Sequence, residues 1–283
     1  MSIVVTGATG NLGGLTVDAL LERGVEPSGI VAAGRNPDRL AELAAKGVGT
    51  AKFDVDDPGT LAATLKGAEM VLLVSLRGNP RRVEQHRSAI EAAKAAGVQR
   101  IIYTSFLHAD RNADHTDHKA TEQMLTESGT AHTVMRNGAY FTFLTRQIPG
   151  WREEREITGA AGAGRISAAS LADLAAANAT VLTTAGHDGC IYELGIDDAF
   201  TMEEFAAELS RQTGEEVPYV DLAADELKSR LVRAGQPEAI ASRRVVSDVG
   251  IAGGLFFTDS GDLARLVGRP LTGLSGAVAQ AIR

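Results

Sequence analysis

The chain has 283 residues, with 28 Lys and Arg against 36 Asp and Glu, which gives a formal net charge of −8. This length is typical of one large globular domain or two smaller ones. The acidic balance argues against a protein that tracks nucleic-acid phosphates, and no apolar run reaches the ~18 residues of a membrane helix. We therefore expect no nucleic-acid partner and no integral membrane contact.

The cysteine content and the first residues bear on location. Cys190 is the only cysteine, so no internal disulfide forms, which is typical of a reducing cytoplasm. Ser2-Ile3-Val4-Val5 has the pattern of a strand and lacks the basic and apolar regions of a signal peptide. We expect a cytoplasmic protein in which Cys190, inside a predicted apolar strand, is an inert core residue.

Apolar runs alternate with amphipathic stretches along the first half of the chain. The pattern predicts strands at Ile3–Thr6, Ile30–Ala33, Thr50–Phe53, Met70–Ser75, Arg100–Ser105 and His132–Arg136. It predicts helices at Leu12–Arg23, Pro37–Lys46, Pro58–Leu65, Val83–Ala96 and Thr116–Ser128, the second with Asn36 as N-cap. Strands that are apolar on both faces and separated by such helices indicate a parallel sheet covered on both sides. The expected fold is α/β, a Rossmann-type doubly wound parallel sheet.

The pattern loosens after Arg136. It predicts helices at Ala169–Thr183, Thr201–Thr213 and Asp225–Ala234, and strands at Cys190–Leu194 and Val217–Val220. Thr201 and Glu204 have the spacing of a capping box. We assign residues 1–140 to the Rossmann domain. Residues 141–283 form a smaller α/β portion on the substrate side, which packs against the first and partly returns to it.

The strongest motif lies between the first predicted strand and helix and reads Thr6-Gly7-Ala8-Thr9-Gly10-Asn11-Leu12-Gly13. Gly7 permits a tight turn, Gly10 lets the backbone approach a pyrophosphate, and Gly13 allows close packing of helix on strand. The helix N-terminus offers N–H groups and a positive dipole end to phosphates. This context predicts a dinucleotide site rather than a plain strand–helix turn.

The end of the second strand bears on which dinucleotide binds. An NAD site would place Asp or Glu there for the ribose hydroxyls, whereas this chain reads Ala33-Gly34-Arg35-Asn36. Arg35 can pair with a 2′-phosphate through a bidentate contact, or it is a solvated surface arginine. We predict NADP(H). Asp54, after the third strand, either accepts from the adenine amino group or caps the following turn.

Several motifs together resemble the NmrA-like branch of atypical short-chain dehydrogenases, in particular its bacterial quinone oxidoreductases, which are similar to triphenylmethane dye reductases. They are the glycine loop Thr6–Gly13, Arg35-Asn36-Pro37, Leu107–Asp110, His118-x-x-Thr121-Glu122, Arg136-Asn137-Gly138-x-Tyr140, Gly159–Gly162, Ser247–Gly250 and Gly253–Phe256. The resemblance covers nearly the whole chain and implies a reductase that uses NADPH without a flavin.

The resemblance also implies which residues line the cofactor. These are Gly7, Thr9, Gly10, Asn11, Leu12, Gly13, Arg35, Ser75, Leu76, Arg77, Asn137, Gly138 and Tyr140. One departure concerns the residue two before Asp173, where relatives often have Arg and this chain has Leu171. A contact that this arginine makes in relatives is therefore in question.

The residues also constrain the chemistry. Ordinary short-chain dehydrogenases use a Tyr with Lys four positions later, and none of the four tyrosines here has that lysine. A quinone needs this acid least, because its reduction gives a phenolate-like anion with a pKa of ~10 that can take a proton from water. We expect direct hydride transfer from NADPH to a quinone or similar aromatic acceptor, with Tyr140 and His118 as catalytic candidates. His118 can equally be a histidine that bonds its neighbours.

Several alternatives stay open. Phe106, Phe141 and Phe143 either complete an apolar acceptor site or belong to the core. A non-catalytic, NADP(H)-sensing regulator of the NmrA type would also lack the Tyr–Lys pair, and Lys119 leaves room for a dye or isoflavone-type reductase. A homodimer is also left open. We predict no metal site for the polar cluster His108, Asp110, Asp114, His115, Asp117 and His118, because its composition is that of a loop.

Overall fold

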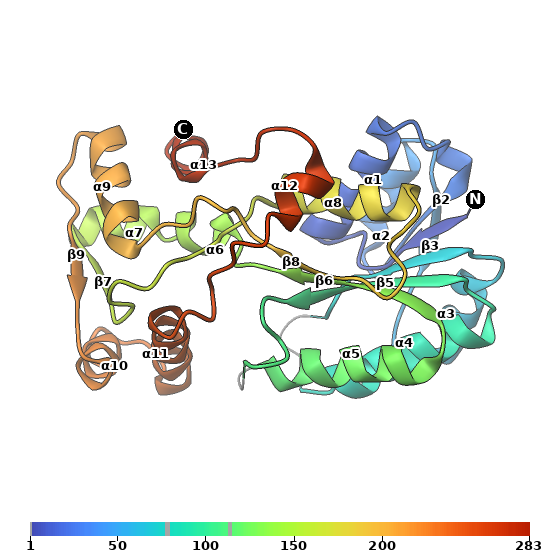
Figure 1. The fold of residues 1–283 in the computed structure, drawn as a ribbon, viewed down its shortest axis with the longest axis horizontal. Helices are drawn as coiled ribbons and strands as arrows, with labels where there is room; N and C mark the ends of the chain where they lie inside the picture. The colour runs from blue at the N-terminus through green and yellow to red at the C-terminus, as the bar shows by residue number, and fades with distance from the viewer. Residues whose placement is uncertain (1, 77–79, 113–114) are drawn as a thin grey trace. The chain divides into compact units, whose positions relative to one another are not determined.

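The computed structural model describes residues 2–76, 80–112 and 115–283. By their contacts, the residues form two compact units, each of which is described by itself. Unit 1 comprises Met1–Asn137, Leu171–Leu194 and Asp262–Arg269, and unit 2 comprises Gly138–Ser170, Gly195–Gly261 and Pro270–Arg283. The chain thus leaves unit 1 after Asn137 and returns to it twice, as the colours in Figure 1 show.

Unit 1 is built on a parallel sheet whose described strands have the order β3-β2-β1-β4-β5-β6-β8. The strands are β1 Ile3–Val5, β2 Ile30–Gly34, β3 Gly49–Lys52, β4 Met70–Leu73, β5 Arg100–Phe106, β6 Ala131–Asn137 and β8 Ile191–Leu194. The direction of winding reverses between β1 and β4, where ligands bind in open α/β sheets. The predicted doubly wound, Rossmann-type sheet is confirmed.

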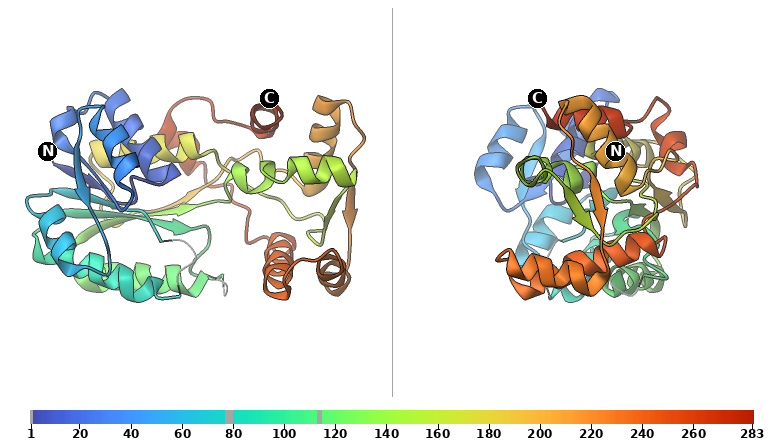
Figure 2. Two further views of the ribbon diagram at one scale, coloured as in Figure 1. Left: turned by 180° about the vertical axis from the view of Figure 1, so that it is seen from behind. Right: turned by 90° about the vertical axis from the view of Figure 1, so that its left-hand side faces the viewer.

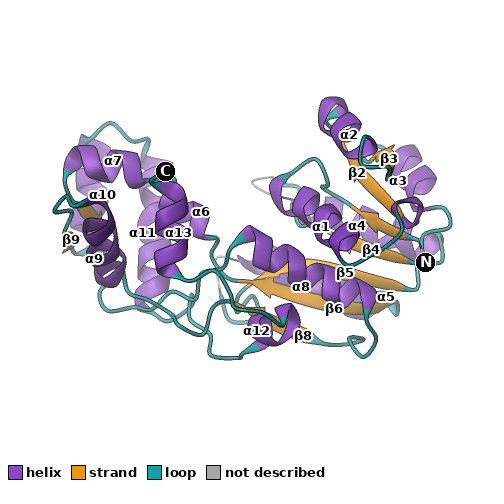
Figure 3. Ribbon diagram, turned by 90° about the horizontal axis from the view of Figure 1, so that it is seen from above, coloured by secondary structure: helices purple, strands orange, loops and turns teal. Residues whose placement is uncertain are grey.

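Helices cover both faces of this sheet (Figures 1 and 3). One face carries α1 Asn11–Glu22, α2 Pro37–Ala44, α8 Leu171–Thr183 and α12 Asp262–Val267, and the other carries α3 Pro58–Leu65, α4 Arg82–Ala95 and α5 Thr116–Ser128. The short 3-10 turn η1 Pro27–Gly29 precedes β2. Buried residues such as Val4, Leu65, Val71, Ile101 and Leu125 fill the space under α3, α4 and α5. This core fixes the strand ends that carry the site.

Local signals that the sequence predicts are present at several helix ends. The side chain of Asn36 accepts from the N–H groups of Asp38 and Arg39 at the start of α2. Both hydrogen bonds of the capping box formed by Thr201 and Glu204 are present. Asp173 is fully buried, and its carboxylate pairs with Arg269 at 2.7 Å. Relatives often have an arginine at the position of Leu171. In this chain the arginine that contacts Asp173 comes from much later in the sequence.

Unit 2 contains a small parallel pair of strands, β7 Ile157–Gly159 and β9 Tyr219–Asp221, together with helices (Figure 2). The helices are α6 Phe141–Thr145, α7 Ile148–Glu154, α9 Met202–Thr213, α10 Ala224–Arg233, α11 Glu238–Ala252 and α13 Leu274–Ala281. The sequence pattern does not predict α6, α7, α11 or α13, nor α12 of unit 1. The core of unit 2 is aromatic, since Phe141 stacks on Phe200 at 5.8 Å and Trp151 meets Phe205 edge-on.

The interpretation of Cys190 as a residue inside a buried strand is wrong. β8 begins at Ile191, and Cys190 precedes it with a half-buried side chain whose Sγ lies 3.7 Å from the carbonyl oxygen of Gly186. Ile191 itself is 51% exposed, because β8 is the edge strand of the sheet. Among the described residues, no helix combines the length and the apolar character that crossing a bilayer requires.

Candidate functional site

The loop between β1 and α1 has the shape of a phosphate-binding turn. Gly7 has a φ of +62°, a left-handed conformation that favours glycine. The N–H of Gly10 donates to the carbonyl oxygen of Gly7 at 2.9 Å and closes the turn. Gly10 is also the N-cap of α1 and has no side chain to cap the first N–H groups, and no acidic residue lies in the first turn. This helix end is therefore free to accept an anion.

Two glycines let the chain approach itself closely beside this loop. A Cβ atom on buried Gly13 would lie 2.4 Å from the carbonyl oxygen of Gly7, and one on Gly34 would lie 2.6 Å from Cγ2 of Thr9. Leu12 is buried, while Asn11 is exposed at the first position of α1. The structure thus brings the predicted residues of the glycine loop together in one cradle that fits a dinucleotide phosphate.

Arg35 is the first residue after β2 and is exposed. The strand ends at Gly34, and none of the residues from Ala33 to Asn36 carries the carboxylate of an NAD site. Arg35 therefore remains the charged group at this strand end. The carboxylate of Asp54 accepts from the N–H of Asp56 at 3.3 Å, so its turn-capping role is observed, whereas its contact with adenine stays a prediction.

The segment after β4 is held by side chains. The N–H of Val74 donates to Oγ1 of Thr6 at 3.1 Å, and that of Ser75 donates to Oγ1 of Thr104 at 2.8 Å. The N–H of Leu76 donates to Nε2 of His86 at 3.1 Å. Ser75 and Leu76 are half-buried, whereas the predicted residue Arg77 lies outside the described residues.

His118, a catalytic candidate, is buried at the start of α5. Its Nε2 lies 3.1 Å from Nη1 of Arg82, which can only donate, so Nε2 accepts. The Nδ1–H of the neutral ring then donates to the hydroxyl of Tyr103 at 2.8 Å. Burial and, next, the charge of Arg82 lower the pKa of His118 to about 3. Both ring nitrogens therefore have protein partners and the ring is neutral at neutral pH.

His86 belongs to the same cluster, since its ring meets Tyr103 edge-on at 5.3 Å. Burial and the charge of Arg82 lower the pKa of His86 to about 4, although Asp117 opposes this. Burial likewise raises the pKa of Tyr103. The cluster is thus a set of neutral, hydrogen-bonded groups around one guanidinium.

The free energy of unfolding is expected to fall as the pH is lowered from about 6.5 to about 4. Unfolded histidines bind a proton near pH 6.5, whereas folded His86 stays neutral down to about pH 4. The unfolded state then binds more protons, so stability rises with pH across this window. His86 alone accounts for about 3 kcal/mol of the fall.

Urea unfolding at pH 7, 6 and 5 measures this dependence. His86→Gln is expected to flatten it, and His132→Gln, a half-buried histidine on β6 outside the cluster, is the matched control. Equal slopes for the wild type and His86→Gln would contradict the assignment.

A second buried cluster surrounds Arg136 at the end of β6. Its guanidinium contacts Glu122 at 2.7 Å, Glu193 at 2.8 Å and Asp110 at 2.8 Å. Burial raises the pKa of Glu193, but hydrogen bonds from His108 and Arg136 outweigh it and hold that pKa below its usual value. Burial also works against the charge of Arg136, and its hydrogen bonds with Glu122 and Glu193 nonetheless raise its pKa. The cluster joins β6, β8, α5 and the loop after β5, beside the predicted cofactor residue Asn137.

In unit 2, Gly138 is buried and Tyr140 is half-buried at the N-cap of α6, where it forms a parallel bridge with Ala169. Phe141 belongs to the core of unit 2, whereas Phe143 is half-buried under the guanidinium of Arg146. In unit 1, Phe106 is half-buried and its ring lies 3.8 Å from that of His115. The roles of Tyr140, Phe106 and Phe143 stay predictions.

Two motifs of unit 2 meet in space. Gly159–Gly162 forms a loop whose N–H groups are taken up by side chains: that of Ala160 by Asp248 at 2.9 Å, and that of Ala161 by the Tyr219 hydroxyl at 3.0 Å. Burial raises the pKa of Asp248. A Cβ on Gly159 would lie 2.7 Å from the Tyr219 hydroxyl, so a side chain at this position would displace Tyr219. These contacts explain why the two motifs occur together.

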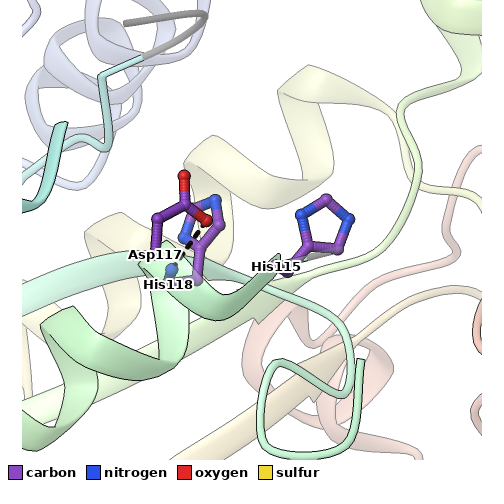
Figure 4. A group of neighbouring side chains, drawn as sticks. All are labelled: His115, Asp117 and His118. Atoms are coloured by element: carbon purple, nitrogen blue, oxygen red, sulfur yellow. Dashed lines mark hydrogen bonds between the residues drawn. The ribbon is translucent and has the colours of Figure 1, made fainter. Parts of the chain in front are cut away.

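One group of side chains has the spacing of metal ligands, namely His115, Asp117 and His118, with ligand atoms within 4.8 Å of one another. Figure 4 shows the N–H of His118 donating to Asp117. The guanidinium of Arg82 contacts both Nε2 of His118 and the carboxylate of Asp117, so a positively charged side chain already occupies this position. The absence of a metal site stays a prediction, and Asp114 lies outside the described residues.

Comparison with known proteins gives the family. A family described as NAD(P)H-binding matches residues 7–182. The chain belongs to this family. It is 42% identical over 280 residues to quinone oxidoreductase 2 of Escherichia coli, covering 98% of this chain and 97% of that protein. The resemblance to quinone oxidoreductases and triphenylmethane dye reductases that the motifs indicate is confirmed.

Solved structures agree with this family. The NADPH-dependent quinone oxidoreductase of Escherichia coli complexed with NADPH has a TM-score of 0.95 at 41% identity, with 99% of this chain and 100% of that chain covered. Triphenylmethane reductase of Citrobacter sp. complexed with NADP(H) has a TM-score of 0.92 at 34% identity, with the same coverage.

The sequence does not predict either of the two buried side-chain clusters, the one of His86 and His118 and the one around Arg136. His86 belongs to no motif, and neither His86 nor Arg82 is among the predicted site residues, although both are central to the first buried cluster. The signal that was available is the polar character of His86 on the α4 face that also carries Ala89, Ile90 and Ala93 toward the core. A polar residue on such a face needs a buried partner.

Proposed function

We propose that the protein is an NADPH-dependent oxidoreductase that transfers a hydride directly to a quinone or a similar aromatic acceptor, without a flavin. The observation that carries this proposal is the phosphate cradle in which Gly13 packs against Gly7, with Arg35 rather than a carboxylate after β2. The relatives named as quinone oxidoreductases support the choice of acceptor.

The chain's own residues contribute binding and orientation. NADPH, when bound, supplies the hydride and becomes NADP+. The N-terminus of α1 and the glycine loop hold the pyrophosphate, and Arg35 pairs with the 2′-phosphate. The reduced acceptor leaves as a hydroquinone after it takes up a proton, and a phenolate-like anion takes that proton from water or from a weak donor.

Tyr140 and His118 remain the catalytic candidates of this proposal. Tyr140 is half-buried and offers a hydroxyl group. His118 is neutral and gives its Nδ1–H to Tyr103, so it would serve as a proton donor only by giving up that hydrogen bond. We also propose a cytoplasmic location, which the single cysteine supports. Whether the protein forms a homodimer is tested by measuring its mass in sedimentation experiments.

A steady-state assay tests the function directly. Purified protein is mixed with menadione and either NADPH or NADH, and the loss of reduced nicotinamide is followed by absorbance. Oxidation of NADPH in preference to NADH is expected. Folded protein that binds NADPH tightly but oxidises neither cofactor would instead support the regulatory alternative.

Replacing Arg35 by serine is expected to lower kcat/KM for NADPH by about 10- to 100-fold and to leave that for NADH nearly unchanged. A hydrogen-bonded charge pair contributes about 1.5–3 kcal/mol, and only NADPH carries the 2′-phosphate. Arg23→Ser is the matched control, because Arg23 is exposed at the opposite end of α1. An equal loss with both cofactors would show that Arg35 does not read the 2′-phosphate.

A further inference from the structure

Three consecutive N–H groups after β4 donate to side chains rather than to a neighbouring strand. The acceptors for Val74 and Ser75 are threonine hydroxyls, from Thr6 after β1 and from Thr104 on β5. The acceptor for Leu76 is different, because His86 reaches it from helix α4. After β4, hydrogen bonds to individual side chains therefore hold the backbone in place of pairing with a neighbouring strand.

This segment lies against the phosphate loop. A Cβ on Gly7 would be 3.2 Å from Cβ of Val74, so the loop after β1 and the segment after β4 pack directly on each other. Both follow the strands between which the winding of the sheet reverses. Val74 makes this contact and is followed directly by Ser75 and Leu76, so a shift of these two residues would be passed through Val74 to the wall of the phosphate cradle.

The protonation state of His86 follows from its partners. Leu76 donates an N–H, so Nε2 of His86 must be the unprotonated nitrogen. Nδ1 then carries the proton and donates to Oγ1 of Thr121 at 3.0 Å, whose own hydroxyl donates to the carbonyl oxygen of Asp117 at 2.9 Å. The donor and the acceptor of each hydrogen bond in this series, from Leu76 to Asp117, are therefore fixed.

The ring of His86 is also held rigidly. It is completely buried, and its edge packs on Tyr103 with an interplanar angle of 75°. Thr121 ties it to α5, so two helices and β5 determine where Nε2 lies. Because the ring is held in this way, its Nε2 accepts the N–H of Leu76 at one fixed position.

We propose that His86 is a positioning residue that fixes the Ser75–Leu76 peptide at the wall of the cofactor site through its unprotonated Nε2. The inference rests on the proposed function in one respect, namely that Ser75 and Leu76 border NADPH. Without this acceptor, the half-buried N–H of Leu76 has lost its partner, and residues 75 and 76 adopt other conformations as well. Only part of the molecules then have the conformation that binds NADPH, and the apparent affinity falls.

Two variants of matched polarity separate this role from a general need for a polar residue. In His86→Gln, Oε1 replaces Nε2 as the acceptor of the Leu76 N–H. In His86→Asn, the shorter side chain keeps a donor for Thr121 but does not reach Leu76. His86→Asn is expected to raise the Kd of NADPH about tenfold, whereas His86→Gln restores most of the affinity.

The measurement is NADPH binding by fluorescence titration, with thermal melting to compare the stability of the two variants. With quinone present, the KM for NADPH is expected to rise in His86→Asn more than kcat at saturating NADPH falls. Equal affinities in His86→Asn and His86→Gln would overturn the proposal.

A readout on the unmodified protein keeps the proposal testable if either variant fails to fold. Long-range nitrogen-15 NMR spectra distinguish the two tautomers of a neutral histidine. His86 is expected to carry its proton on Nδ1, and a proton on Nε2 would overturn the assignment. Neither the spectrum nor the NADPH titration involves a quinone, so failure of the proposed function would be seen separately, as wild-type protein that binds NADPH without turnover.

Discussion

Gly13→Ala is expected to weaken NADPH binding by about 100-fold. The added Cβ would lie 2.4 Å from the carbonyl oxygen of Gly7, 2.6 Å from its carbonyl carbon and 2.9 Å from Cα of Ala8. All three are backbone atoms, so no side-chain rotation relieves the overlap. Either α1 moves away from the sheet or the loop changes shape, and overpacking of this kind costs up to about 3 kcal/mol, which corresponds to about 100-fold in affinity.

The experiment measures the Kd of NADPH by fluorescence titration and the melting temperature of each variant. Gly150→Ala is the matched control, because Gly150 also lies within a helix, has no positive φ, and would have no atom within 4 Å of an added Cβ. The control is expected to keep its affinity. Gly13→Ala with wild-type affinity would mean that the close approach of Gly13 to Gly7 does not shape the phosphate cradle.

The parts of the fold that sequence predicts well are those with local causes. The phosphate loop needs glycines at fixed spacing between a strand and a helix, and all of its conditions lie within Thr6–Gly13. The caps at Asn36 and Thr201 involve side chains and N–H groups two or three residues apart. The alternation of apolar strands and helices then leaves few topologies other than a doubly wound sheet.

The helices that the pattern did not predict have weaker local signals. α6 has only five residues, and α11 does not have a clear apolar face: Asp248 and Gly250 are buried, whereas Val246 and Val249 are 43% and 50% exposed. Asp248 is buried because it accepts the N–H of Ala160, a residue 88 positions earlier. In α11 a charged residue is therefore buried while valines are exposed, and the periodicity of apolar residues in the sequence does not reveal this.

The buried side-chain clusters depend on contacts between distant segments. His86 meets residues 10 and 35 positions away, and Arg136 contacts carboxylates from α5, the loop after β5 and strand β8. Each residue is unremarkable in its own stretch of sequence. The resemblance to a known family placed Arg136 in a motif, but only the fold shows that three carboxylates converge on it.

Arg136→Met is expected to lower the free energy of unfolding by about 3–5 kcal/mol at pH 7. Glu122 is only 9% exposed and Glu193 is largely buried, so removal of the guanidinium leaves two carboxylates close together without a cation. Methionine keeps most of the side-chain volume, which makes charge rather than packing the main change.

Urea unfolding of four proteins tests this account: wild type, Arg136→Met, Glu122→Gln and the double variant. Glutamine at position 122 removes one negative charge and still accepts from the hydroxyl of Ser105, which donates to Glu122 at 2.5 Å. If uncompensated charge causes the loss, the double variant is more stable than Arg136→Met, although each single variant is less stable than the wild type. A double variant that loses the sum of the two single effects would show that Arg136 and Glu122 stabilise the fold independently. Arg152→Met is the matched control, because its pair with Glu215 is solvent-exposed and an exposed pair contributes about 1 kcal/mol or less.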